Sequence, residues 1–168
     1  LWETGSRINY GIKFSHFFNK SGTFSGLIGQ SYKFKNPDSF EKGSGLEKKP
    51  SDFVLDFLFK PNKAITLSYK GMLDDHDIDL RRSEFDMLIT YPKWGVRAGH
   101  VLLNNVEILN FKEQREARLA TFFNITDRWL IQAALRYDVV SKNSLNNRIS
   151  AVYVDDCMSF EIGFRRKF

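Results

Sequence analysis

The sequence predicts an all-β protein, an antiparallel up-and-down barrel of about ten strands in one domain, residues 1–168. Three observations support this fold class. Apolar and polar residues alternate with a period of two over long runs, turn-forming residues separate the runs, and no run approaches the ~18–20 consecutive apolar residues of a membrane helix. A composition of 42% hydrophobic and 27% charged residues fits alternating strands, whose average hydrophobicity stays low.

The first five expected strands are residues 6–18, 23–35, 51–60, 63–74 and 77–91. The second run is the least regular, because Gly26, Gly29 and Gln30 interrupt it. The next three runs alternate clearly, since polar residues such as Asp56 separate their apolar positions. Those apolar positions are Phe53, Leu55, Phe57, Phe59, Ile65, Leu67, Tyr69, Phe85, Met87, Ile89 and Tyr91.

The last five expected strands are residues 94–104, 113–125, 128–141, 147–156 and 157–168. The eighth run is the clearest of all. Its residues Ile131 and Leu135 share one parity, whereas Gln132 and Arg136 share the other. Because alternate side chains of a strand point to the same face of a sheet, each run predicts one apolar face and one polar face.

Two kinds of connection alternate along the chain. Tight breakers occur at 19–22, 61–63, 92–93 and 126–127. The intervening connections are mostly longer and more polar, at 36–50, 105–112 and 142–146, with 74–77 a shorter case. In an up-and-down barrel this order places tight turns at one rim and long loops at the other, which is the arrangement of outer-membrane barrels.

Alternation alone does not say which face lies inside the barrel. A soluble lipid-binding barrel would turn its apolar face inward, whereas a transmembrane barrel turns it toward lipid. Many of the runs reach ten or more residues, enough for a tilted membrane crossing of ~9–11 residues. Aromatic residues such as Tyr91, Trp129 and Tyr153 recur near strand ends, as in an interfacial girdle. Both features favour a transmembrane β-barrel.

This orientation assigns a side to each face. Charged residues of both signs in mid-strand would face a wet lumen, and those we expect there are Arg82, Glu84, Asp86, Glu116, Arg118, Arg136, Asp138 and Glu161. Apolar residues of the opposite parity would face membrane lipid, and those we expect there are Phe57, Leu67, Ile131, Leu135 and Ile162.

No catalytic set is visible, so we expect no enzyme activity, no cofactor and no metal centre. His16, His76 and His100 fall in separate strands or loops without ligand spacing. The acidic stretch 74–79 offers oxygen ligands for a divalent cation. It lacks the glycine and terminal glutamate of a calcium loop, and we interpret it as a solvated rim loop. The net charge of +5 mixes both signs along the chain, which does not predict a nucleic-acid-binding face.

Several short motifs occur in a fixed order. They are GQSYKF at 29–34, GSGL at 43–46, SDFV at 51–54, TDRW at 126–129 and the tail from Tyr153 to Phe168. This ordered set resembles the C-terminal barrel of the LptD family, the lipopolysaccharide-assembly or organic solvent tolerance proteins. The resemblance runs from about residue 5 to 168.

The resemblance implies that the chain is the C-terminal part of a larger barrel, a translocon that inserts lipopolysaccharide into the outer leaflet of the bacterial outer membrane. It further implies an LptE-type lipoprotein as a plug. A periplasmic jellyroll outside this sequence would receive the cargo from a periplasmic Lpt bridge, and the cargo would leave through a lateral opening between the first and last strands. The chain starts without Met or a signal peptide, and we interpret it as a piece of a longer protein. A porin or other diffusion channel remains an alternative, as does the soluble lipid-binding barrel.

Cys157 is the single cysteine of the chain. The resemblance places it where LptD proteins tie the barrel to the jellyroll. It therefore implies a disulfide between Cys157 and a cysteine outside this sequence, in an oxidising periplasm. The family often has two adjacent cysteines at this point, whereas here Asp156 precedes Cys157.

Overall fold

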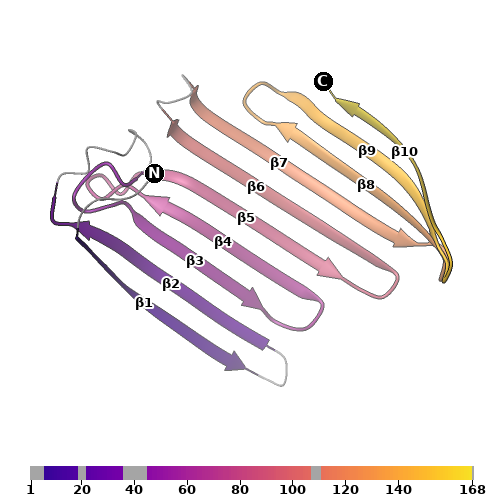
Figure 1. Ribbon diagram of the computed structural model, residues 1–168, viewed down its shortest axis with the longest axis horizontal. Helices are drawn as coiled ribbons and strands as arrows, with labels where there is room; N and C mark the ends of the chain where they lie inside the picture. Colours follow the sequence, from indigo (N-terminus) through magenta and orange to yellow (C-terminus); the bar gives the residue numbers. More distant parts are fainter. Residues whose placement is uncertain (1–5, 19–21, 36–44, 107–110, 168) are drawn as a thin grey trace.

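The computed structural model describes residues 6–18, 22–35, 45–106 and 111–167. In this part of the chain, ten strands form one antiparallel sheet whose spatial order follows the sequence (Figure 1). The strands are β1 (Arg7–Phe18), β2 (Gly22–Lys33), β3 (Phe53–Lys60), β4 (Ile65–Leu73), β5 (Leu80–Thr90), β6 (Trp94–Val106), β7 (Phe111–Asn124), β8 (Trp129–Asp138), β9 (Asn143–Val154) and β10 (Ser159–Lys167). Among these residues, no helix is long and apolar enough to cross a membrane.

Hairpin turns end the strands where the sequence predicts breakers. In the β3–β4 turn, the side-chain oxygen of Asn62 accepts hydrogen bonds from the backbone amides of Ala64 and Ile65, at 2.9 and 3.0 Å. In the β7–β8 turn, Thr126 Oγ1 accepts from the amides of Arg128 and Trp129. Short polar side chains that bind the backbone in this way replace ladder hydrogen bonds and so stop a strand. We call the sheet edge with these turns the tight-turn rim and the opposite edge the loop rim.

The loop rim differs from prediction at two places. The expected strand 77–91 begins only at Leu80, because 74–79 closes a turn in which the Asp74 amide donates to the Asp79 carbonyl and Ile78 has a φ of 57°. The expected strand 128–141 ends at Asp138, whose carboxylate caps a turn over 139–142. The predicted long loop 142–146 is therefore wrong, since Asn143 already pairs with Asp138. Residues 36–44 and 107–110 of the other predicted loops lie outside the described residues.

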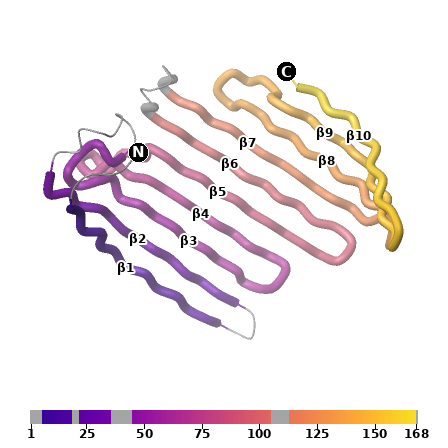
Figure 2. Tube along the Cα trace, in the orientation of Figure 1, coloured from indigo at the N-terminus to yellow at the C-terminus, as the bar shows by residue number. Residues whose placement is uncertain are grey.

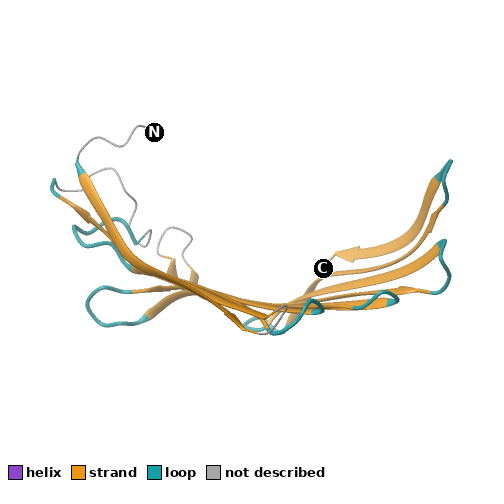
Figure 3. Ribbon diagram, turned by 90° about the horizontal axis from the view of Figure 1, so that it is seen from below, coloured by secondary structure: helices purple, strands orange, loops and turns teal. Residues whose placement is uncertain are grey.

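The sheet is open. β1 pairs only with β2 and β10 only with β9 in the part of the chain that the structure describes, and these strands lie at opposite edges (Figure 2). Both ends of the sheet bend toward the same side, so that the sheet forms a trough (Figure 3). A closed barrel is thus not formed by these ten strands alone.

The register sorts the side chains into two faces, because directly opposed residues of antiparallel strands project from the same face. One row across the sheet runs Leu67, Met87, Ala98, Leu119 and Leu135 from β4 to β8. We call the face that carries this row the apolar face. A second row runs Asp86, Gly99, Arg118 and Arg136 from β5 to β8, and it belongs to the opposite, polar face.

The sheet has no hydrophobic core of its own. None of the described hydrophobic side chains is buried, and large apolar residues are widely exposed, for example Ile12 at 73%, Ile162 at 62% and Phe164 at 66%. A lone sheet that leaves its apolar face uncovered needs lipid or another part of the protein against that face.

Candidate functional site

The polar face carries all eight charged residues that the sequence assigns to the lumen-facing side. Glu84 lies opposite Val101, which lies opposite Glu116, which in turn lies opposite Asp138. Arg82 has the parity of Glu84. Glu161 opposes Val152, and Val152 opposes Leu130, which has the parity of Arg136. Glu161 therefore projects from the same face. The remaining members, Asp86, Arg118 and Arg136, share the row described above.

The five residues that the sequence assigns to the lipid-facing side also share one face. Leu67 and Leu135 belong to the apolar row. Phe57 shares the parity of Phe59, which opposes Leu67. Ile131 opposes Ala151, and Ala151 opposes Ile162. The period of two in the sequence thus holds across the seven strand pairings from β3 to β10.

Ion pairs cover the polar face: three join neighbouring strands, and one, Arg82 with Glu84, lies along β5. Arg97 Nε lies 3.2 Å from Asp86 Oδ1, and Arg136 Nη2 lies 2.7 Å from Glu116 Oε2. Arg82 pairs with Glu84, and Arg148 pairs with Glu161. Exposed pairs of this kind contribute little in bulk water. Their effect here is to hold guanidinium groups upright in fixed positions over the sheet.

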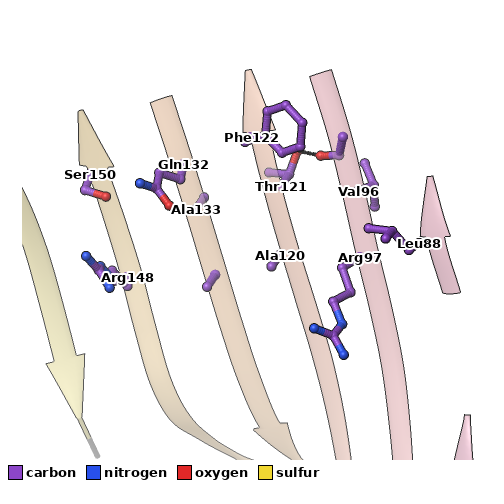
Figure 4. Close-up of a pocket in the computed structure, with 12 residues that line it drawn as sticks. Leu88, Val96, Arg97, Ala120, Thr121, Phe122, Gln132, Ala133, Arg148 and Ser150 are labelled. Atoms are coloured by element: carbon purple, nitrogen blue, oxygen red, sulfur yellow. Dashed lines mark hydrogen bonds between the residues drawn. The ribbon is translucent and has the colours of Figure 1, made fainter. Parts of the chain in front are cut away.

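A shallow hollow of about 200 Å³ lies on the polar face over β5–β9 (Figure 4). Its floor consists of small side chains, Ala120 and Ala134, which face one another on β7 and β8. Arg97 and Arg148 lie on either side of this floor, and Gln132 supplies an amide.

Phe122 covers the end of the hollow nearer the tight-turn rim. Its ring lies over Gly95 so closely that a Cβ on Gly95 would come within 2.2 Å of the ring. Glycine on β6 therefore makes room for this aromatic side chain. Gln132 lies opposite Phe122 on β8, and Ser150, only 4% exposed, lies opposite Gln132 on β9, so the hollow combines an apolar wall with polar groups.

A second group of charges lies at the loop rim, and we call it the rim cluster: Glu47, Lys48, Asp52, Asp74, Asp75 and Arg81. Arg81 is its centre. It is the extra residue of a β-bulge in β5, since Met72 pairs with Arg82 and Leu73 pairs with Leu80. A bulge redirects a side chain out of the alternation, and this one turns Arg81 toward carboxylates from other segments.

Arg81 contacts three carboxylates. Its Nη1 donates to Glu47 Oε1 at 2.8 Å and its Nη2 donates to Asp74. Its Nε lies 3.3 Å from Asp52 Oδ2, an ion-pair distance without hydrogen-bond geometry. Lys48 adds a bond of 2.9 Å to Asp75. The cluster therefore crosslinks the β2–β3 connection, the β4–β5 turn and the start of β5.

The environment separates the pKa values of two carboxyl groups in the cluster. Burial raises the pKa of Asp52 to about 6, against the opposing attraction of Arg81. The pKa of Asp74 is lowered instead, chiefly because its carboxylate accepts the backbone N–H of His76 and also binds Arg81. The carboxylate oxygens of Asp52, Asp74 and Asp75 lie within 4.8 Å of one another, and Arg81 and Lys48 supply the compensating positive charge.

Three of the sequence motifs meet at this cluster. The Gln30 amide of GQSYKF donates to the Ser51 carbonyl at 2.7 Å, and Ser51 Oγ accepts from the Ser31 amide at 2.9 Å. The Asp52 amide of SDFV donates to the carbonyl of Gly45 in GSGL. Gly45 has a φ of 73°, and a Cβ there would lie 2.9 Å from the Asp52 carboxylate. Only glycine fits this position.

The interpretation of 74–79 as a solvated loop is wrong for its first two residues. Asp74 is buried and the Asp75 side chain is nearly so, because both bind the basic residues of the rim cluster. His76, Asp77 and Ile78 are exposed, as expected. Sequence reasoning missed Arg81 as the centre, because a bulge breaks the parity on which the assignment rests. It also passed over Arg97 and Arg148, although their parity identifies them as members of the polar face.

Aromatic residues gather on the apolar face near the tight-turn rim. The rings of Tyr91 and Trp94 lie 5.0 Å apart, and those of Trp129 and Tyr153 lie 5.2 Å apart. Phe59 contacts Phe18 and Phe24 in the same zone of β1–β3. Cys157 is exposed in the β9–β10 turn of this rim, and it is the only free cysteine of the described residues.

Comparison with known protein families gives one match. A family model described as "LptD: LPS transport system D" matches residues 1–129. This range contains strands β1–β7 and the rim cluster, and it ends at the first residue of β8. No curated protein matches the chain.

Proposed function

The chain belongs to the LptD family, a family of outer-membrane proteins of lipopolysaccharide transport and not of enzymes, and from this premise we propose that it forms ten strands of the wall of a lipopolysaccharide translocon. The translocon inserts lipopolysaccharide into the outer leaflet of the outer membrane. The single observation that carries this proposal is the sorting of the sheet into a continuous apolar face and a charged polar face. Further strands close the barrel, since β1 and β10 each keep a free edge among the described residues.

In this proposal the apolar face contacts membrane lipid and the polar face lines a wet lumen. The exposed apolar side chains of Ile12, Ile162 and Phe164 support the lipid contact, because their exposure to water would be unfavourable. The aromatic rings at the tight-turn rim support an interfacial girdle at the headgroup level. The tight-turn rim is then periplasmic and the loop rim, with the rim cluster, is extracellular.

The lumen side serves two partners. Lipopolysaccharide sugars are hydrated by the charged side chains of β5–β10, and an LptE-type plug lipoprotein contacts the same wall. A periplasmic jellyroll delivers the cargo from the Lpt bridge. The mechanism involves no covalent step. Polar groups exchange water for sugar hydroxyls as the glycan passes, while the acyl chains leave toward lipid between two strands of the closed barrel.

Site-specific photocrosslinking in the full-length protein tests the proposal. A photoreactive residue at Gln132, on the polar face, should crosslink to lipopolysaccharide only while transport proceeds and should lose the product when energy is withdrawn. The matched position is Ile131, its neighbour on the apolar face, where any crosslink to lipid should be independent of transport. Equal, transport-independent products at both positions would exclude the polar face from the cargo route.

Cys157 has a role in the same proposal. It forms a disulfide with a cysteine of the periplasmic part and so fixes the jellyroll beneath the lumen. The exposure of Cys157 in the β9–β10 turn supports this, because an exposed thiol is accessible to a partner. Thiol alkylation of the denatured, non-reduced full-length protein is the test. We expect Cys157 to resist alkylation until a reductant is added; alkylation without reduction would rule out the bond.

A further inference from the structure

The polar face holds arginines directly opposite one another. Arg118 on β7 opposes Arg136 on β8, and Arg148 on β9 opposes Arg165 on β10. Like charges at directly opposed positions of a sheet repel, since their Cβ atoms are only ~4.5–5.5 Å apart. A sequence that keeps two such pairs on adjacent strands gains nothing in stability from them. Glu116 and Glu161 offset part of this charge from within the sheet, and an anion from outside can offset the rest.

Of the arginines on this face, Arg97 and Arg148 line the hollow, whereas Arg118, Arg136 and Arg165 lie next to it. The row Arg97, Ala120, Ala134, Arg148 and Arg165 crosses β6–β10, and the two alanines form the floor between the flanking guanidinium groups. The next row places Arg118 and Arg136 one step along the strands toward the loop rim. Because the floor side chains are methyl groups, a ligand can reach the sheet surface there and meet guanidinium groups from several sides.

The carboxylates on this face leave part of the positive charge available. Asp86 pairs with Arg97, Glu116 with Arg136, and Glu161 with Arg148. Arg118 makes no ion pair with any described residue, and it stands beside Arg136. The paired carboxylates orient their arginines, while the outward N–H groups of each guanidinium remain free to bind an anion.

We propose that this hollow is a subsite for a phosphorylated sugar of the glycolipid cargo, with the phosphate held by Arg97, Arg118, Arg136 and Arg148. The inference rests on the proposed function, which makes the polar face lumenal. The planar guanidinium group of arginine donates two parallel hydrogen bonds to a pair of oxygens of one phosphate. The volume of about 200 Å³ is below the ~300–1,000 Å³ of pockets for drug-sized ligands, so it admits one sugar unit and not a whole glycolipid.

The neighbouring groups suit the sugar ring attached to that phosphate. Gln132 offers an amide for sugar hydroxyl groups, and the ring of Phe122, which lies opposite Gln132 on the neighbouring strand, forms an apolar wall beside it. An acidic loop of a plug protein would need only the arginines. The combination of an apolar wall, hydrogen-bonding groups and clustered guanidinium groups favours a phosphorylated sugar over a protein carboxylate.

The test uses the full-length protein with its plug and a photoreactive residue at Gln132, probed with lipopolysaccharide and with the same lipopolysaccharide after enzymatic dephosphorylation. We expect the phosphorylated form to crosslink at concentrations roughly tenfold lower. The double variant Arg118→Gln/Arg148→Gln should abolish this preference. Arg82→Gln, which removes one positive charge from the same face outside the hollow, is the control, and it is compared with Arg118→Gln and Arg148→Gln as single variants as well as with the double variant.

Each outcome separates the subsite from the wider proposal. If crosslinking to lipopolysaccharide occurs but neither dephosphorylation nor the double variant changes it, the subsite is wrong and the lumenal wall stands. If Arg82→Gln lowers crosslinking as much as the double variant, the effect is one of general charge and the subsite is again wrong. If the product at Gln132 is the plug protein and depends on the arginines, the occupant is a protein carboxylate. If no lipopolysaccharide reaches Gln132 in any protein, the proposed function itself fails.

Discussion

At the scale of single residues, the rim cluster shows how burial and hydrogen bonding act on chemically identical groups. Asp52 is 3% exposed and receives an ion-pair contact but no hydrogen bond at Oδ2, so burial dominates and its pKa rises to about 6. Asp74 accepts two backbone N–H groups and the Arg81 guanidinium, so its charged form is favoured. Two aspartates 22 positions apart in sequence thus respond to pH in opposite directions.

This difference predicts the pH dependence of the rim. Between about pH 4 and 6 the folded chain keeps a proton on Asp52 that the unfolded chain loses, so the stability contribution of this group falls as pH rises through that window. Asp74 contributes stability above its ordinary pKa and loses it as pH falls below about 4. We expect Asp52→Asn to flatten the dependence of the unfolding free energy on pH between pH 4 and 6, which removes a change of about 3 kcal/mol at most over that window.

Hydrogen exchange of residues 45–52 in the detergent-solubilised full-length protein, followed across pH 3.5–7, measures this slope. Intrinsic exchange also varies with pH and must be divided out. Asp127→Asn, in a turn at the opposite rim, is the matched control and should leave the slope as in the wild type. The same slope in Asp52→Asn and in the wild type would contradict the assignment of the raised pKa to Asp52.

At the scale of strands, the positions of the strands could be predicted almost entirely from the alternation of apolar and polar residues. All ten strands occur, and most of their ends lie within two or three residues of expectation, because period-two patterning and turn residues act locally. The failures have local causes as well. Ile78 and Lys142 adopt positive φ values in turns, which no apolar pattern announces. The bulge at Arg81 depends on pairing with a partner strand and is invisible in β5 alone.

An arginine substitution should have a different effect on the free energy of folding at each of the two faces. Leu135→Arg puts a charge on the apolar face and should cost ~2–4 kcal/mol if it lies near mid-membrane, whereas Gln132→Arg on the polar face should cost little. Equilibrium refolding of the full-length protein into bilayers measures both free energies. Costs within 1 kcal/mol of each other would remove the basis for an outward apolar face.

At the scale of the whole molecule, the open sheet limits what this sequence can do alone. The polar face and the motifs could be read from the sequence, but the rim cluster could not, because its members come from three segments that only the sheet order brings together. The edges of β1 and β10 carry backbone N–H and C=O groups without partners among the described strands. In lipid such groups are costly, and in water they recruit other strands.

The isolated chain of residues 1–168 should therefore self-associate through its edges. We expect refolding in detergent to give oligomers or aggregates with β-structure in place of a folded monomer. Size-exclusion chromatography with light scattering reports the mass, and the full-length protein under the same conditions is the comparison. A stable monomer with slow exchange of the β1 and β10 amides would mean that ten strands close by themselves.

Each strand of the sheet pairs only with the strands before and after it in sequence. One consequence concerns how such a wall changes during evolution. Loss or duplication of one hairpin, such as β7–β8, leaves the pairing within every other hairpin intact and joins strands that are already antiparallel. The number of strands in the closed barrel then changes by two at a time, and the width of the pore changes with it. The sequences of the remaining strands need not change.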